Sequence, residues 1–255
     1  MNLEGIKAVI SGAASGLGHA VAERVVSHGG QVVMLDINEE QGAEAARALG
    51  NAATFLRVDV AAEPEVNNAV DKAAGIMGGV NLAVNCAGII GAARVLGREG
   101  PMDGSFFAKV IQVNLVGSFF LGKAAAHAMQ DNEPSAEGER GLIVNTASVA
   151  AYEGQIGQAA YAASKGGIVS LTLPMARELA RLGIRVMTIA PGIFMTPMMA
   201  GLPENVQQSL GQQVPFPPRL GRPEEFADLV SHICENVMLN GETIRLDGAI
   251  RMQPK

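Results

Sequence analysis

The sequence predicts one doubly wound α/β domain over residues 1–255, with a seven-stranded, mainly parallel sheet and helices on both faces. Short apolar runs alternate with longer helical segments, which is typical of βαβ units. The runs 142–144 and 186–189 are almost continuously apolar, as strands buried on both faces are. A glycine-rich turn at residues 11–18 joins the first strand to the first helix. The length alone would also allow two domains, but this alternation continues to the end.

The elements follow in order along the chain. We expect strands at residues 7–11, 31–36, 53–58, 81–85, 141–146, 184–190 and 242–246. We expect helices at residues 17–28, 41–49, 63–77, 104–130, 157–182 and 224–235, the first two ended by glycine. Residues 195–223 interrupt the pattern with six prolines and little charge. This segment is either a mobile lid over a cleft or an ordered surface excursion.

Composition excludes several classes of protein. With 48% apolar and 17% charged residues the chain is not disordered, and its net charge of −6 argues against a broad nucleic-acid surface. Two cysteines cannot form a disulfide framework, so we expect a reducing compartment. The histidines are scattered, and we expect no metal site. The longest uncharged stretch, 73–93, holds five glycines, so we expect no membrane span. No leader is evident, and we expect a cytoplasmic protein.

The glycine-rich turn predicts a dinucleotide site. Gly12 allows a tight turn, Gly16 permits close approach of a ligand, and Gly18 permits close helix packing. The following helix start offers N–H groups to a pyrophosphate, although glycines also serve ordinary turns. Asp36 ends the second strand, where a carboxylate accepts hydrogen bonds from ribose hydroxyls and repels a 2′-phosphate. We therefore expect NAD; the alternative is that Asp36 caps a helix.

Three residues predict acid–base chemistry on a substrate oxygen. Tyr161 and Lys165 are four residues apart on an expected helix, so they share one face. A nearby ammonium favours the phenolate, so we expect Lys165 to lower the pKa of Tyr161. Ser148 follows the fifth strand, at the sheet edge where ligands bind, and can hydrogen-bond a substrate oxygen. Tyr152 has no cation at this spacing, and no His–Asp pair supports Ser148 as a nucleophile.

Over nearly its whole length the chain resembles the short-chain dehydrogenase/reductase family, whose Rossmann-type fold agrees with the prediction. The glycine turn has Ser11 where that family has threonine, Asn85-Cys86-Ala87-Gly88 matches a second motif, and Pro191-Gly192 to Thr196 a third. The resemblance implies a catalytic set of Asn114, Ser148, Tyr161 and Lys165, with Asn114 at a helix kink. It implies cofactor contacts from Gly12, Ser15, Leu17, Asp36, Asp59, Val60, Cys86, Tyr161, Lys165, Phe194 and Thr196, and substrate contacts from Ser148, Gln155, Gln158 and Tyr161. Cys86 is interpreted as a backbone contact and not a redox thiol.

A narrower group, the type II 3-hydroxyacyl-CoA dehydrogenases (17β-hydroxysteroid dehydrogenases type 10), is similar in longer segments: residues 132–134, 141–155, 214–221 and 244–254. This similarity implies reversible, NAD-dependent oxidation of a short or 2-methyl-branched 3-hydroxyacyl-CoA, in fatty acid metabolism or branched-chain amino acid degradation. The alternatives are a steroid or other hydrophobic-alcohol dehydrogenase, a 3-oxoacyl carrier-protein reductase, and a non-catalytic NAD-binding module. Relatives imply a homotetramer, and mitochondrial location as the alternative to the cytoplasm.

Overall fold

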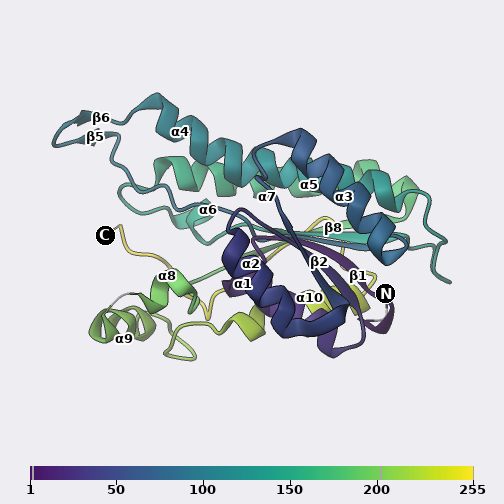
Figure 1. Ribbon diagram of the computed structural model, residues 1–255. Helices are drawn as coiled ribbons and strands as arrows, with labels where there is room; N and C mark the ends of the chain where they lie inside the picture. The colour runs from purple at the N-terminus through teal and green to yellow at the C-terminus, as the bar shows by residue number, and fades with distance from the viewer. Residues whose placement is uncertain (2, 202, 255) are drawn as a thin grey trace.

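The protein folds around one seven-stranded parallel sheet, as predicted (Figure 1). The structure is a computed structural model that describes residue 1, residues 3–201 and residues 203–254. The strand order is β3-β2-β1-β4-β7-β8-β9, so the order reverses direction between β1 and β4. The strands are β1 (Lys7–Ser11), β2 (Gln31–Asp36), β3 (Ala53–Arg57), β4 (Leu82–Asn85), β7 (Gly141–Thr146), β8 (Ile184–Pro191) and β9 (Thr243–Leu246). Every pairing in this sheet is parallel, which is the geometry that βαβ units impose.

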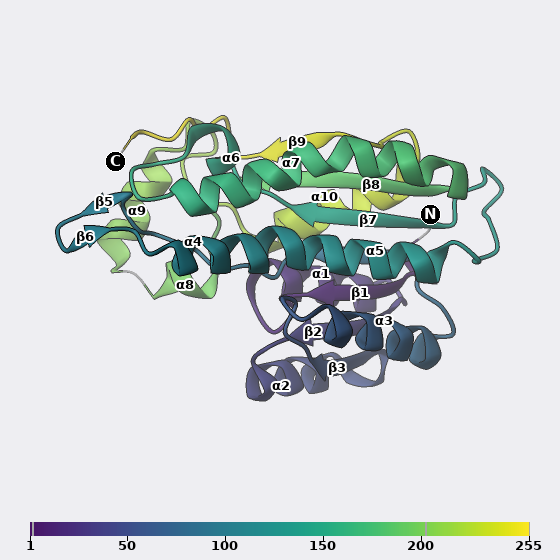
Figure 2. The same cartoon turned by 90° about the horizontal axis from the view of Figure 1, so that it is seen from above.

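Helices cover both faces of the sheet and enclose two apolar cores. Figure 1 shows α1, α2 and α10 on one face and α3, α5 and α7 on the other, and Figure 2 shows the second layer from above. The helices are α1 (Gly16–Ser27), α2 (Glu39–Leu49), α3 (Glu63–Met77), α4 (Gly104–Ile111), α5 (Gly117–Met129), α7 (Ala159–Leu179) and α10 (Pro223–Glu235). The sheet strands β7 and β8 are buried at every position, which explains their unbroken apolar sequence.

Three differences from the predicted elements have local causes. Helix α2 begins at Glu39, two residues earlier than expected, because the Asn38 side chain accepts a hydrogen bond from the Gln41 amide and caps the helix. The long helix expected at 104–130 contains a π-helical turn, Gln112–Val116, between α4 and α5. The expected helix at 157–182 begins at Ala159 and ends in a short 3₁₀ turn.

The proline-rich segment 195–223 contains two short helices, α8 (Pro197–Ala200) and α9 (Glu204–Gln212), that sequence periodicity did not indicate. They lie at the same end of the molecule as α6 (Ala150–Glu153), the C-terminus and the hairpin of β5 (Leu96–Gly97) and β6 (Gly100–Pro101) (Figure 1). The backbone of Met195 donates to Gly221 over 2.8 Å, so both ends of the segment are fixed to each other. That this segment acts as a mobile lid stays a prediction.

The continuous helix Gly104–Met129 is long and apolar enough to cross a membrane by length and composition. Core helices of soluble proteins also meet this criterion, and here the α5 part packs on β4, β7 and α3. It also carries buried Asn114 and Ser118, whose polar atoms bond within the protein. We therefore interpret it as a helix of the domain core.

Candidate active site

The glycine-rich turn between β1 and α1 is shaped by backbone contacts that exclude side chains. Gly12 has φ +66°, and a Cβ there would lie 2.6 Å from the backbone nitrogen of Ala87. Gly16 also has a positive φ, +58°, and faces Thr196 across the turn. A Cβ on Gly18 would overlap the carbonyl oxygen of Gly12. The turn therefore brings bare backbone and the start of α1 to one wall of a cleft, the arrangement that suits a pyrophosphate.

Asp36 lies at the carboxyl end of β2, beside this turn. Its Oδ2 accepts a hydrogen bond from the Ala14 amide at 3.1 Å and its Oδ1 accepts from the Asn38 amide at 3.0 Å. The helix cap of α2 is Asn38, so the alternative role of Asp36 as a cap is wrong. The carboxylate is held in place by two backbone amides and lines the cleft, where it can accept hydrogen bonds from a ribose.

The cleft has a volume of about 690 Å³, and its lining has the chemistry that suits a dinucleotide. Of the predicted cofactor residues, those that line it are Gly12, Ser15, Leu17, Asp36, Asp59, Val60, Cys86 and Thr196. Asp59 is fixed by the amide of Ala61, which donates to its Oδ1 over 2.9 Å. A tight glycine cradle at one place and a fixed carboxylate at another are the two features that a pyrophosphate and an adenosine ribose require.

A second cavity, of about 370 Å³, adjoins the first and is lined by three of the four predicted catalytic residues, Ser148, Tyr161 and Lys165. Its lining includes Ser148, Gln155, Gln158, Tyr161, Lys165, Phe194 and Thr196. Six residues line both cavities, namely Leu17, Cys86, Gly88, Ile89, Ile90 and Thr196. The two cavities are therefore parts of one continuous cleft, so a molecule bound in one part can meet a molecule bound in the other.

Asn114 lies at the centre of the π-helical turn between α4 and α5, fully buried. Its Oδ1 accepts from the Ile89 amide at 2.8 Å, and its Nδ2 donates to the Ile89 carbonyl and to Ser164 Oγ, both at 3.0 Å. Asn114 was expected at a helix kink; the structure has a π-helical turn at this position, a feature common at functional sites. Asn114 does not line the cavity; it holds Ile89, which does.

Lys165 is buried and one turn after Tyr161 on α7. Its Nζ donates to the carbonyl oxygen of Thr146, at the end of β7, over 2.8 Å. Burial lowers the pKa of Lys165 to about 8, because a charge removed from water is disfavoured. A lysine with this pKa is a charged group at neutral pH that can lose its proton in a mildly alkaline medium.

Tyr161 and Ser148 both line this cavity. Burial raises the pKa of Tyr161 above that of free tyrosine, and the Ser148 hydroxyl nearby offsets this in part. The expected net lowering of the Tyr161 pKa is therefore wrong for this structure, because burial outweighs the effect of the Lys165 charge. The Lys165 ammonium lies 5.8 Å from the Tyr161 ring centre and donates to the Thr146 carbonyl. Tyr161 is held as a neutral phenol, a proton donor at neutral pH.

The remaining predicted residues are positioned as follows. Gln158 caps α7, and its Oε1 accepts from the Gln155 amide at 3.0 Å, so both line the cavity as one loop. Phe194 is buried, and its ring packs on Gly221, so it forms a wall. Burial raises the pKa of Cys86 to about 11, which keeps its thiol protonated and agrees with a backbone role.

Sequence reasoning missed three residues that build this site. Thr146 accepts the hydrogen bond of Lys165, Ser164 accepts that of Asn114, and Met252 lines the catalytic cavity from the C-terminal segment. Ser164 also donates to the Tyr161 carbonyl over 2.7 Å. No sequence pattern marks these contacts, because each depends on how distant segments meet in the fold. Among the residues that the structure describes, no group of three or more metal-binding side chains is found.

Fold and site together define a dinucleotide-binding α/β protein with a Ser–Tyr–Lys constellation in the same cleft. The profile of the short chain dehydrogenase family matches residues 7–207. The chain therefore belongs to the short-chain dehydrogenase family, as its resemblance implied.

Individual relatives are similar along the whole chain. The human protein named 3-hydroxyacyl-CoA dehydrogenase type-2 is 53% identical over 99% of this chain and 98% of its own length. The Drosophila melanogaster protein of the same name is 48% identical over 96% of this chain and 97% of its own. A crystal structure of 3-hydroxyacyl-CoA dehydrogenase type-2 from Mycobacterium avium superposes with a TM-score of 0.95, at 43% identity, over 99% of this chain and 98% of that one.

Proposed function

We propose that this protein is an NAD-dependent dehydrogenase that interconverts a secondary alcohol and a ketone, with short or 2-methyl-branched 3-hydroxyacyl-CoA thioesters as its substrates. One observation carries the proposal: Ser148, Tyr161 and Lys165 line a cavity that opens into the dinucleotide cleft. The names of relatives that match nearly all of this chain support the thioester as substrate class. Roles in fatty acid metabolism and branched-chain amino acid degradation would follow from such a substrate.

The chain's own residues supply the binding of the substrate oxygen and the movement of its proton. Ser148 and Tyr161 line the same cavity, so both hydroxyls can contact one substrate oxygen. In ketone reduction, the neutral phenol of Tyr161 gives its proton to the forming alkoxide; in alcohol oxidation it takes that proton back. The Lys165 ammonium favours the transient phenolate. When bound, the nicotinamide supplies the hydride acceptor for oxidation and the hydride donor for reduction.

The preference for NAD over NADP rests on the surroundings of Asp36. Its carboxylate lies at the edge of the cleft, next to exposed Ile37. Among the described residues, the lining of this cleft includes one cation, Lys109. Arg57 lies opposite Asp36 on the neighbouring strand β3, where it forms an ion pair with Glu65. A 2′-phosphate placed beside Asp36 would meet the negative charge of its carboxylate.

A direct assay tests the function. The purified protein is incubated with NADH and acetoacetyl-CoA, and the nicotinamide absorbance is followed. We expect turnover with NADH well above that with NADPH. A 3-oxoacyl carrier-protein reductase would instead prefer NADPH, a hydrophobic-alcohol dehydrogenase would oxidise steroid alcohols and leave the thioester unchanged, and a binding module would show affinity for NADH without turnover. Each of these three results would contradict the proposal.

We also propose a homo-oligomer, a tetramer as in the expectation from sequence. An apolar groove runs between α5 and α7 and is lined by Leu115, Val116, Phe119, Gly167, Ser170, Leu171 and Pro174. Phe119 is 40% exposed and Leu173, on the same helix as the groove's Pro174, is 44% exposed. Exposed apolar surface of this kind is typical of protein interfaces. Light scattering with wild-type and Phe119→Glu protein tests the oligomer: the variant should have a lower mass, and a monomeric wild type would contradict the proposal.

Cytoplasmic location stays a prediction that cell fractionation would test.

A further inference from the structure

The C-terminal segment after β9 returns to the catalytic cavity through a tight turn. Gly248 and Ala249 both have positive φ, +58° and +68°. The Ala249 amide donates to Asp247 Oδ1 over 2.9 Å, and the Ile250 amide donates to the Asp247 carbonyl over 3.1 Å. Ile250 is almost fully buried, so its side chain fixes the far side of the turn. The direction of the segment is therefore set by local backbone structure and burial together.

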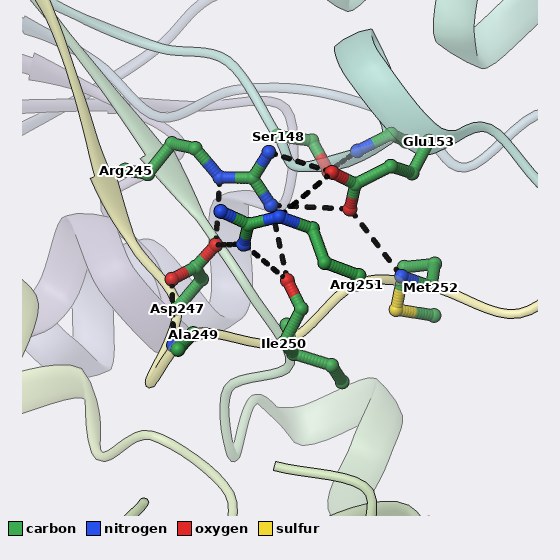
Figure 3. A network of polar contacts seen from close by, with 9 residues as sticks. Ser148, Glu153, Arg245, Asp247, Ala249, Ile250, Arg251 and Met252 are labelled. Carbon is green, nitrogen blue, oxygen red and sulfur yellow. Dashed lines mark hydrogen bonds and ion pairs between the residues drawn. The ribbon is translucent and has the colours of Figure 1, made fainter. Parts of the chain in front are cut away.

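A network of charged side chains joins this turn to α6 (Figure 3). Arg245 donates to both carboxylate oxygens of Glu153, over 2.7 and 3.1 Å, and to Asp247 Oδ2 over 2.7 Å. Arg251 lies against the same two carboxylates. The hydrogen bonds from Arg245 hold the pKa of Glu153 below its usual range. Since bidentate arginine–carboxylate pairs are geometrically specific, this network fixes an orientation as well as a distance.

The same carboxylate also holds the backbone of the segment that follows. The Met252 amide donates to Glu153 Oε2 over 3.3 Å, and Figure 3 shows this contact beside the arginines. Two residues further, Gln155 Nε2 donates to the Gln253 carbonyl over 3.0 Å. The Ile156 amide donates to the Pro254 carbonyl, also over 3.0 Å. Three consecutive residues of the segment are thus bonded to the chain that follows Ser148.

Met252 is the member of this segment whose side chain lines the catalytic cavity, together with Ser148 and Tyr161. Met199 of α8 and Leu210 of α9 supply apolar side chains to the same cavity from the proline-rich segment. Methionine is apolar and unbranched, so it suits contact with an alkyl chain. Unlike Met199 and Leu210, Met252 is tied to α6 by the charge network, and α6 begins two residues after Ser148. Catalytic serine and apolar wall therefore keep a fixed spacing.

We propose that Met252 determines substrate specificity by limiting the length of the acyl chain that the cavity accepts, and that Glu153 and Arg245 are positioning residues that hold it there. The inference rests on the proposed function, since it assigns one wall of the proposed thioester site. It adds a role for residues near the C-terminus, more than ninety positions from Glu153 in the sequence.

The test compares chain-length profiles of 3-oxoacyl-CoA reduction by wild-type, Met252→Ala and Met252→Phe protein, with four-, six-, eight- and ten-carbon thioesters and NADH. We expect Met252→Ala to raise the ratio of kcat/KM for ten over four carbons by about tenfold, since a cavity that gains or loses methylene-sized space discriminates by that order. Met252→Phe should lower the same ratio. The matched control is Met238→Ala, because Met238 is 90% exposed; its profile should equal that of the wild type.

Glu153→Gln tests the positioning role separately. This variant keeps the side-chain size but removes the charge that Arg245 and Arg251 contact. We expect it to shift the chain-length ratio in the same direction as Met252→Ala, with little change for the four-carbon substrate, and to add nothing in the double variant. A uniform loss of kcat with all four thioesters would mean a purely structural role and would overturn the positioning part.

The outcomes separate the two proposals. Wild-type protein that reduces the thioesters, with superimposable profiles for the wild type and both Met252 variants, overturns the inference alone. Wild-type protein that reduces none of the thioesters overturns the proposed function and the inference with it. NADH affinity and thermal unfolding, measured on each variant, show whether a variant is folded before its profile is compared.

Discussion

Lys165 Nζ lies 5.8 Å from the centre of the Tyr161 ring and donates a hydrogen bond to the carbonyl oxygen of Thr146. Both side chains line the same cavity, one helical turn apart, with Lys165 buried and Tyr161 partly exposed. In this arrangement burial raises the pKa of Tyr161 and lowers that of Lys165. Phenol and ammonium are thereby present together at neutral pH, which is the state that ketone reduction needs.

Removal of the Tyr161 hydroxyl should abolish most of the turnover and leave coenzyme binding intact. Tyr161→Phe keeps the ring but has no proton to transfer, so we expect kcat to fall by about 10²–10⁴. NADH affinity, measured by fluorescence titration, should stay near that of the wild type. The matched control is Tyr152→Phe, since Tyr152 is half-exposed and is the other tyrosine of the chain. Near-normal turnover by Tyr161→Phe would contradict the assigned role.

The pH profile of ketone reduction should report Lys165. Its pKa is about 8, so the Lys165 side chain is protonated below that pH and loses its proton above it. The pKa of Tyr161 is raised, so its phenol keeps its proton over the same interval. We therefore expect kcat/KM to be flat on the acid side of pH 8 and to decrease above it.

Lys165→Arg provides the comparison for this profile, because a guanidinium keeps its charge throughout the range. Its activity should be lower, since the larger head group does not fit the Thr146 contact, but the decrease above pH 8 should disappear. A decrease at the same pH in both proteins would assign the titration to another group.

Asn114 should matter for stability as well as for activity. Asn114→Ala leaves the partly buried amide and carbonyl of Ile89 without these partners, which costs about 1 kcal/mol, the lower end of the range for buried groups. We expect a decrease of that size in the free energy of unfolding in urea, and weaker NADH binding, because Ile89 lines the cleft. Asn67→Ala, on the exposed face of α3, is the control and should leave both unchanged. Wild-type stability in the Asn114 variant would show that Asn114 does not hold Ile89.

The sheet was predicted well from the sequence, because strands that are buried on both faces are continuous runs of apolar residues. The run at β7 and the glycine turn before α1 are local signals, and the structure places both where they were expected. The short helices α8 and α9 have no such pattern in the sequence. They contain few apolar residues at helical spacing and depend on contacts with the rest of the fold.

In the candidate site, too, residues marked by a local pattern were predicted, and residues that depend on distant contacts were missed. Tyr161 and Lys165 were identified because their spacing on one helix makes them neighbours. The direction of the Tyr161 pKa was predicted wrongly, because burial dominates it and burial is not a feature of the i, i+4 spacing. Met252 was missed because it meets Glu153 across 99 positions of sequence. Contacts of that range are set by topology and not by a local pattern.

Coenzyme preference should respond to two neighbouring positions. The double variant Asp36→Ala, Ile37→Arg removes the carboxylate at the edge of the cleft and adds a cation at an exposed position beside it. A charged hydrogen bond to a 2′-phosphate is worth about 1.5–3 kcal/mol, so the ratio of kcat/KM for NADPH over NADH should rise by about 10–100-fold. Steady-state kinetics with both coenzymes measures it. An unchanged ratio would mean that Asp36 does not face the ribose.

The glycine turn offers a test in which backbone strain and steric exclusion are separated. Gly12 and Gly78 have nearly the same φ, +66° and +67°, so the left-handed conformation costs alanine at either position about 1–2 kcal/mol of free energy. A Cβ at Gly78 meets only the end of the Lys7 side chain at 3.6 Å, whereas at Gly12 it meets the Ala87 backbone at 2.6 Å.

Gly78→Ala should therefore lose about 1–2 kcal/mol of unfolding free energy and bind NADH normally. Gly12→Ala should lose more and bind NADH far more weakly, because the turn must move away from Cys86 and Ala87, which follow β4, and so reshape the pyrophosphate wall of the cleft. Urea unfolding and calorimetric NADH titration measure the two effects. Equal losses of stability with equal NADH affinity in the two variants would show that the contact between the turn and residues 86–87 does not shape the site.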